Sequence, residues 1–412
     1  MVVPFALCVR VVTHYLVTMR TVDLIVSRHT VSYSKNVYPN TWQCMKRKFL
    51  QFYNTRTNWN DTCNSTTFLH NGLHFVWDEA QPEWFQLEHG AFDKVPEADE
   101  IYLTSSAMMS LKKAYEWAKM SPETKIIVGG PVPRVHKIVS TEPLPSNLIF
   151  TTALAETLFD KKPNPLGFKL VPPGDVNGSY TYSYPYHTYC RWGQCRFCVE
   201  PKVRDREWSL EPLRNAPKGS VYLSCLSLGL SELEDIIHAD LDYENRKYIF
   251  SIRADINLLA ALKRIPKPNR ILLKVGVEFP SERMYAYMRK GIPIVEVVKF
   301  INETAEMGYN VSLSFITHWG ILTPSVLDEA KVFFSQIRGH WMANTASAAS
   351  RFLAYPKLED VDRSLYFDAP VTIGPFVVGH YLKQSVEQEK LNAEWIEILN
   401  DNGITRNPGK LP

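Results

Sequence analysis

The sequence of 412 residues lacks any run of eighteen apolar residues, so we expect no segment to span a membrane. Residues 1–19 are interrupted by Arg10 and His14, and they have neither a basic start nor a small-residue cleavage site, which argues against a signal peptide. The net charge is only +3, which gives no general case for binding nucleic acid. The seven cysteines are an odd number with three close together, unlike a secreted disulfide framework. We therefore expect a protein of a reducing compartment, the cytoplasm.

The composition is otherwise that of a globular protein with a sizeable core. Hydrophobic residues make up 45% of the chain and charged residues 22%. A length of 412 residues suggests two or three domains. Residues 156–178 are rich in proline and glycine, and we interpret them as a linker. We place a first domain at residues 1–175, a second at 176–340 and a C-terminal extension at 341–412, in which a last barrel strand is a candidate element.

The first domain contains the pattern of a parallel sheet. A strand, a helix and a second strand are expected at residues 100–104, 110–120 and 125–128. This order is a βαβ unit with a right-handed crossover. Gly129 and Gly130 follow the second strand, where glycines permit a tight turn or the close approach of a ligand. Residues 5–12 and 22–26 are also expected to be strands, whereas residues 33–95 give little signal.

The second half of the chain alternates strands and helices. Strands are expected at residues 180–186, 221–224, 248–252, 270–277, 311–316 and 351–355, with helices between them. About six such units predict a partial barrel with its site at the carboxyl ends of the strands. A further helix is expected at 387–399. The predicted fold class is thus α/β: a Rossmann-like, flavodoxin-like parallel sheet domain, a partial (β/α)6 TIM-type barrel and a helical C-terminal extension.

Three cysteines within nine residues form the most informative motif of the sequence. Cys190, Cys195 and Cys198 can bring three thiolates to one metal centre, and Phe197 precedes the last of them. A structural zinc ion needs four ligands, whereas an iron–sulfur cluster held by three cysteines leaves one iron open. Two interpretations follow from the residues: such a cluster, or a zinc site that takes its fourth ligand from Cys225 or a histidine.

The cysteine loop resembles the cluster loop of the radical S-adenosylmethionine (SAM) enzymes, in which SAM chelates the open iron. The spacer between the first two cysteines has four residues where the family usually has three, and one more loop residue costs little. A second stretch, with Arg253, Asp255, Glu278 and the Met288 to Gly291 segment, resembles the branch with an N-terminal cobalamin-binding-like domain. The family's Gly-Gly-Glu signature is missing after the second strand.

The first domain resembles that cobalamin-binding-like domain at Ser105, Ser106, Gly129 and Gly130. The Asp-x-His-x-x-Gly motif, which supplies a cobalt ligand in other cobalamin proteins, is absent. The resemblance therefore leaves two alternatives. Either the domain binds cobalamin without a protein ligand, with Ser106, Gly129 and Gly130 as candidate contacts, or it has lost the cofactor.

The resemblance also implies roles for residues of the predicted barrel. The three cysteines would ligate a [4Fe–4S] cluster that Phe197 shields, and the Phe197 backbone is a candidate contact of the SAM adenine. The candidate SAM contacts are Ser224 in place of the missing signature, Arg253 for the methionine carboxylate and Glu278 for the ribose hydroxyls. An ion pair that only stabilises the barrel mouth is the alternative for Glu278 and Arg253. His318 is a candidate substrate contact, or else a solvated loop histidine.

The function implied is that of a radical SAM enzyme. In this family the reduced cluster passes one electron to SAM, and the resulting 5′-deoxyadenosyl radical removes a hydrogen atom from the substrate. The implied partners are an external electron donor of the flavodoxin or ferredoxin type and a small-molecule or macromolecular substrate that the sequence does not identify. A cobalamin-dependent methylase is one candidate reaction class. The alternative is a non-catalytic α/β protein with a structural zinc site at the cysteines.

Overall fold

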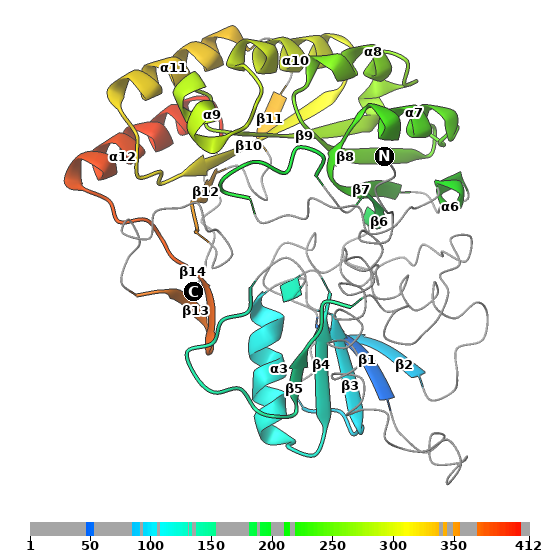
Figure 1. The fold of residues 1–412 in the computed structure, drawn as a ribbon. Helices are drawn as coiled ribbons and strands as arrows, with labels where there is room; N and C mark the ends of the chain where they lie inside the picture. The colour runs from blue at the N-terminus through cyan, green and yellow to red at the C-terminus, as the bar shows by residue number, and fades with distance from the viewer. Residues whose placement is uncertain are drawn as a thin grey trace, which may run out of the picture. The chain divides into compact units, whose positions relative to one another are not determined.

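The computed structural model describes the parts of the chain that form the two parallel sheets, the helices beside them and the C-terminal hairpin and helix (Figure 1). The described residues are 47–52, 85–90, 94–104, 108–130, 132–133, 137–153, 181–187, 190–198, 210–214, 219–337, 341–343, 349–354 and 369–404. The expected strands at 5–12 and 22–26 lie outside them, as does the linker at 156–178. No described helix is both long and apolar enough to cross a membrane.

The first sheet is entirely parallel, with strand order β2-β1-β3-β4-β5. Its strands are β1 (Arg47–Phe52), β2 (Phe85–Gly90), β3 (Glu100–Thr104), β4 (Lys125–Gly129) and β5 (Leu148–Phe150). Helix α3 (Met108–Met120) joins β3 to β4, which confirms the expected strand–helix–strand unit. Strands β1 and β2 lie within residues 33–95, for which the sequence predicted no elements.

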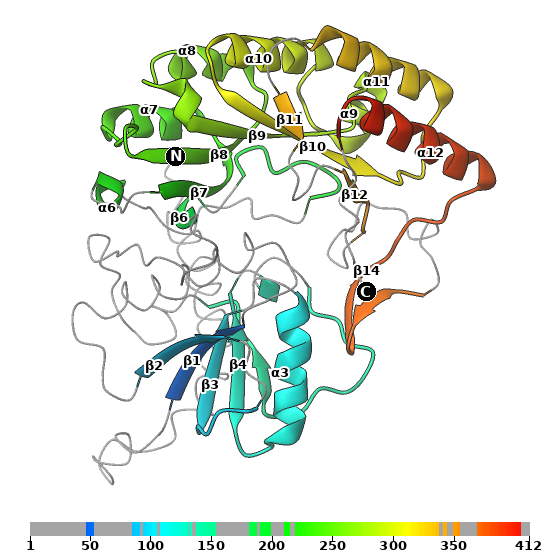
Figure 2. The same cartoon turned by 180° about the vertical axis from the view of Figure 1, so that it is seen from behind.

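Helix α3 covers one face of this sheet and contacts β4 and β5 (Figure 1 and Figure 2). Its residues Leu111, Ala114 and Trp117 are fully buried, because they recur at the three-to-four-residue spacing of one helix face. The Asn147 side-chain amide lies at the end of this helix and donates to the Ala118 and Ser121 carbonyls at 3.1 and 2.9 Å. This side chain therefore satisfies the Ala118 carbonyl, one of the acceptors that the helix leaves unpaired at its C-terminus.

The second sheet is also parallel, and its strands lie side by side in the order of the sequence. The order is β6-β7-β8-β9-β10-β11, and β12 also pairs with β10. The strands are β6 (Thr181–His187), β7 (Gly219–Leu228), β8 (Arg246–Ile252), β9 (Ile271–Glu278), β10 (Asn310–Thr317), β11 (Trp341–Ala343) and β12 (Ala349–Arg351). The sixth strand expected at 351–355 is wrong in its bounds: two short strands, β11 and β12, share that position beside β10.

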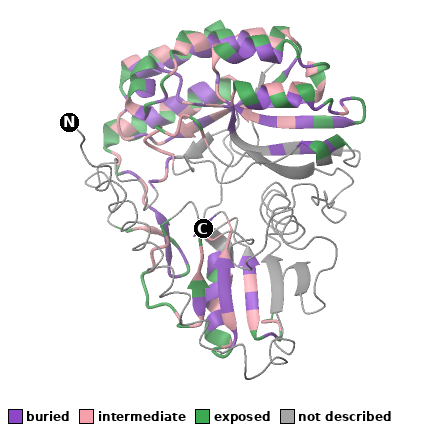
Figure 3. Cartoon of the chain, turned by 45° about the vertical axis from the view of Figure 1, so that its right-hand side comes forward, coloured by how far each residue is buried: buried purple, intermediate pink, exposed green. Residues whose placement is uncertain are grey.

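The helices that connect these strands bury one face of the second sheet. They are α6 (Glu211–Arg214), α7 (Leu230–His238), α8 (Leu259–Leu262), α9 (Glu282–Met288), α10 (Ile294–Glu306) and α11 (Pro324–Gln336), with short 3-10 turns η2 (Ile256–Leu258) and η3 (Pro268–Arg270). Figure 3 shows the alternation of buried and exposed positions along them. Strand β9 alternates likewise, since Leu273 and Val275 are buried while Lys274 and Gly276 are half-buried.

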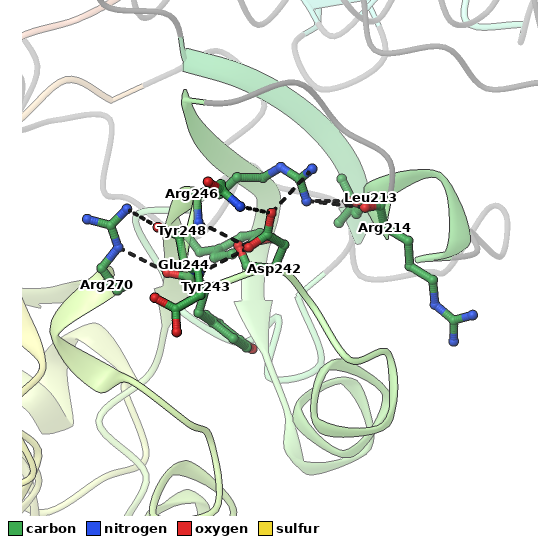
Figure 4. Close-up of polar contacts among 9 residues, drawn as sticks. Leu213, Arg214, Asp242, Tyr243, Glu244, Arg246, Tyr248 and Arg270 are labelled. Carbon is green, nitrogen blue, oxygen red and sulfur yellow. Dashed lines mark hydrogen bonds and ion pairs between the residues drawn. The ribbon is translucent and has the colours of Figure 1, made fainter.

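The amino end of β8 is closed by polar contacts, which Figure 4 shows. Arg246 is 6% exposed, and its guanidinium donates to the Leu213 carbonyl at 2.9 Å and pairs with Asp242 at 3.8 Å. Arg270 donates to the Tyr243 carbonyl at 3.1 Å. In parallel barrels this end serves stability, whereas the opposite end carries chemistry. We therefore assign this group to the scaffold.

The C-terminal segment contains a hairpin as well as the expected helix. Antiparallel strands β13 (Val371–Ile373) and β14 (Phe376–Gly379) precede α12 (Val386–Asp401). The extension that the sequence predicted as helical thus also contains a β-hairpin. Phe376 is fully buried and meets the rings of Tyr115 and Phe150 edge to face, at centroid distances of 6.1 and 5.9 Å. Helix α12 contacts α11 and β10.

We predict that α12 is an integral part of the second sheet's core. Trp395 is fully buried, stacks near Phe279 at 4.3 Å between centroids and donates to the Ile316 carbonyl at 3.0 Å. Trp395→Ala should lower the free energy of unfolding by about 3–5 kcal/mol, because it leaves a large cavity. Val386→Ala, on the same helix but 70% exposed, is the control. Equal denaturation midpoints for the two variants would contradict this packing.

Candidate functional site

Three of the sequence-predicted residues lie at the carboxyl edge of the second sheet. Arg253 directly follows β8, Glu278 is the last residue of β9, and His318 directly follows β10. These strands are parallel neighbours, so their carboxyl ends meet at one edge. Both Glu278 and His318 have positive φ angles, of 69° and 61°, which are uncommon outside glycine. Such backbone is maintained by its surroundings and is concentrated at functional sites.

The Glu278 carboxylate folds back over Gly276 and faces Lys290. A Cβ atom on Gly276 would overlap Oε1 of Glu278, so only glycine leaves room for this arrangement. The Lys290 ammonium lies 3.7 Å from that oxygen and donates a hydrogen bond of 2.5 Å to the Gly276 carbonyl. Both side chains are largely buried, at 9% and 16% exposure for Lys290 and Glu278. A buried charge of this kind requires a partner.

The electrostatics of this pair follow from burial. Burial raises the pKa of the Glu278 carboxyl, and the nearby Lys290 ammonium opposes that shift. Lys290 was part of a recognised sequence motif, but its role as a partner of Glu278 was not predicted. The only sequence signal was a lysine beside Gly291 in the turn after α9.

The cysteine loop is anchored to the second sheet's helices by the two residues after Cys190. Arg191 forms an ion pair of 2.7 Å with Glu232, whose other carboxylate oxygen accepts from the Gly229 N–H at 3.0 Å. This contact fixes the loop to the start of α7. The Trp192 indole donates to the Arg289 carbonyl at 2.7 Å, which fixes it to the turn after α9.

The residues before Cys198 add two further anchors. The Arg196 N–H donates to the Met288 carbonyl at 3.1 Å, and its guanidinium lies 4.8 Å from the Tyr287 ring centroid. Phe197 meets Trp319 edge to face at 6.1 Å. Because Trp319 follows β10, this contact ties the loop to a third element. A stretch without regular secondary structure is thus held at separate points along its length.

The three cysteines of the loop are half-buried. Burial raises the pKa of the Cys195 thiol, while the charges of Lys290 and Arg253 lower it. Within the described part of the chain, no three His, Cys, Asp or Glu side chains are grouped closely enough to hold one metal ion. A four-iron cluster is larger than one ion and takes each thiolate on a different iron. Three thiolates are a donor set that fits a four-iron cluster with one open iron, and they are also three of the four ligands that a zinc ion needs.

The structure describes the remaining predicted residues only in part. Ser106 lies outside the described residues, and Ser224 lies in β7 with its side chain undescribed. Gly129 is the last residue of strand β4 in the first sheet. Gly130 follows it and has a φ of 92°. The His318 ring contacts the Thr317 hydroxyl at 2.8 Å. Its assignment as a substrate contact stays a prediction.

Solved structures with the same arrangement of elements are cobalamin-dependent enzymes. A structure of the cobalamin-dependent S-adenosylmethionine radical enzyme OxsB, with aqua-cobalamin and SAM bound, matches 92% of this chain and 72% of that chain at a TM-score of 0.57 and 12% identity. Another OxsB structure, with aqua-cobalamin bound, matches 76% of this chain at a TM-score of 0.50 and 14% identity. In that match the chain spans only 56% of the length of OxsB.

A third match is to a methyltransferase. The radical S-adenosylmethionine methyltransferase TsrM from Kitasatospora setae, with cobalamin and a [4Fe-4S] cluster bound, matches 89% of this chain and 90% of that chain. The TM-score is 0.51 and the identity is 11%. No protein-family model and no curated protein matches the chain. At these identities the likeness is one of fold: the chain has the α/β fold, with parallel sheets, of the cobalamin-dependent radical SAM enzymes.

Proposed function

We propose that the protein is a radical SAM enzyme in which Cys190, Cys195 and Cys198 hold a [4Fe–4S] cluster. The observation that carries this proposal is the cysteine loop itself, anchored at several points to elements of a sequentially ordered parallel sheet, with two cations acting on Cys195. The fold of OxsB and TsrM supports it. When bound, the cluster and SAM supply a 5′-deoxyadenosyl radical, and the protein orients the reactants and excludes solvent.

The strand orders support the proposed domain organisation. The order β2-β1-β3-β4-β5 is that of flavodoxin-like sheets, which supports a Rossmann-like domain within residues 1–175. Six positions filled in sequence order by parallel strands support a partial TIM-type barrel that begins near residue 176. The barrel's last position is filled by β11 and β12, so the C-terminal extension proposed at 341–412 contributes to the barrel as well.

The charges at the strand ends match the groups of SAM. Arg253 and Lys290 are cations whose charges act on Cys195, and they would pair with the methionine carboxylate of SAM. Glu278 would accept hydrogen bonds from the ribose hydroxyls. Lys290 favours the ionised, accepting form of this carboxylate against the effect of burial. The same pair would also stabilise the barrel mouth, so the two roles need an experiment that separates them.

The first domain is proposed to bind cobalamin. Gly129 and Gly130 lie at the carboxyl end of β4, the edge at which open parallel sheets bind ligands. OxsB and TsrM were both solved with cobalamin bound. A cobalamin-dependent methylase is the reaction class that this cofactor favours. An external flavodoxin- or ferredoxin-type donor would supply the electron.

The cluster assignment predicts a specific effect of Cys195→Ala. The variant should lose the iron-dependent visible absorbance and should not cleave SAM, because one of three cluster ligands is gone. Iron and acid-labile sulfide are measured after anaerobic reconstitution. Cys225→Ala is the control, because Cys225 is outside the loop and is the candidate fourth ligand of a zinc site. A Cys195→Ala variant with full iron and sulfide would disprove the assignment, and loss of bound zinc in Cys225→Ala would favour the zinc alternative.

The two roles of Glu278 make different predictions. Glu278→Gln keeps the shape and removes the charge, so SAM should bind about tenfold more weakly, since charge-assisted hydrogen bonds contribute roughly 1.5–3 kcal/mol. Gly276→Ala should act in the same direction, because a new Cβ displaces the carboxylate. Gly320→Ala is the matched control, since its Cβ would meet Leu382 at an ordinary 3.5 Å. If Glu278→Gln binds SAM normally but melts at a clearly lower temperature, Glu278 only stabilises the structure through its ion pair and does not contact the ribose.

Cobalamin binding is tested by titration with hydroxocobalamin. The wild-type protein should bind it, and Gly130→Ala should bind it more weakly because a side chain is strained at a φ of 92° and obstructs the strand end. Gly403→Ala is the matched control: it carries a similar strain at a φ of 74°, beyond α12, with no atom within 4 Å of its Cβ. Absence of binding by the wild-type protein at physiological cobalamin concentrations would leave the domain as a scaffold.

A further inference from the structure

We propose that Trp192 is a positioning residue, which fixes Arg253 and the turn that carries Lys290 beside Cys195. This inference rests on the proposed function and goes beyond it, because it gives a role to the spacer between the first two cysteines. That spacer is one residue longer than is usual in the radical SAM family. Extra loop residues are usually neutral in their effect, but this spacer contributes an aromatic side chain to the site.

Trp192 fits into a recess that exists because residue 291 is glycine. A Cβ atom on Gly291 would overlap the six-membered ring of the indole, and Gly291 has a φ of 67°. Glycine meets two requirements at position 291: it adopts the left-handed backbone conformation, and it leaves space for the indole ring. The indole N–H donates to the Arg289 carbonyl at 2.7 Å. The ring is therefore held in position and in orientation by the same turn.

Arg253 is held between Trp192 and this turn. Its guanidinium carbon lies 4.8 Å from the Trp192 ring centroid, and its Nη2 donates to the Lys290 carbonyl. A guanidinium that lies over an aromatic ring gains a cation–π attraction and keeps its edges available for hydrogen bonds. The stack therefore fixes the direction of the Arg253 side chain without occupying all of its donors.

The turn itself sets the position of Lys290. Arg289 has a left-handed φ of 55°, and the Lys290 N–H bonds to the Tyr285 carbonyl at 3.0 Å, so α9 ends at a defined point. The Lys290 side chain then reaches the Gly276 carbonyl and Glu278. Trp192 binds the carbonyl just before Lys290. It thus connects the cysteine loop to both cations that act on Cys195.

A second anchor makes this role separable from simple support of the loop. Arg191 holds the loop at Glu232 and the start of α7, independently of the turn after α9. Loss of Trp192 should therefore leave the loop attached and the cysteines in place. What should change is the freedom of Arg253 and of the Lys290 turn.

The test uses anaerobically reconstituted full-length protein, with iron content, SAM dissociation constant and the cluster's midpoint potential as readouts. Trp192→Ala should keep nearly full iron and bind SAM about tenfold more weakly, as loss of a half-buried cation–π contact predicts. Trp192→Phe should recover most of the affinity, because it keeps a ring under Arg253. Arg253→Ala should lose affinity similarly, and the double variant should lose no more than the larger single loss.

Each other outcome has a defined meaning. Full SAM affinity in Trp192→Ala, or losses that add in the double variant, would overturn the inference. Loss of iron in both Trp192→Ala and Trp192→Phe would also overturn it, because the residue would then support the loop alone. Arg191→Ala is the comparison variant for Trp192→Ala. It should bind less iron, but the molecules that carry a cluster should bind SAM with unchanged affinity. If the wild-type protein forms no cluster, the proposed function fails instead, which is a separate result.

Discussion

The buried ammonium of Lys290 is the charge around which the carboxyl edge of the second sheet is organised. A cation at 7% exposure must find partners that replace water, and it finds the Gly276 carbonyl and the Glu278 carboxylate. Several local features follow from this requirement. A side chain at residue 276 would displace the Glu278 carboxylate from this position, and Glu278 adopts an uncommon backbone conformation. The pair brings one charge of each sign to the edge where parallel barrels bind their ligands.

The cysteine loop depends on the same edge for its order. It has no regular secondary structure, and its side chains reach three separate places: the start of α7, the turn after α9 and the segment after β10. Rigid elements thus hold an irregular segment in position, which is how loops acquire precise geometry. The anchors alternate with the cysteines along the chain. As a result each stretch of chain between two cysteines is fixed to an element of the second sheet.

The sequence predicted the elements whose pattern is local. The unit β3-α3-β4 and the strands β8, β9 and β10 have periodic apolar residues bounded by turn residues, and they were predicted to within a few residues. Strands β1 and β2 were missed because residues 33–95 carry many aromatic and polar residues without a clear period. Arg253 and Glu278 were placed correctly at strand ends because that placement follows from parallel topology. The roles of Lys290 and Trp192 were not predicted, because their partners are distant in the sequence. Trp192 and Arg289, for example, are 97 residues apart.

The central claim is that the three cysteines hold a redox-active cluster which acts on SAM. The most direct measurement is anaerobic reconstitution with iron and sulfide, followed by addition of SAM and a strong reductant, with 5′-deoxyadenosine and methionine quantified over time. A [4Fe–4S] cluster that acts on SAM should give a brown protein that forms both products only when reduced. A colourless protein that binds zinc at the cysteines and forms neither product would contradict it.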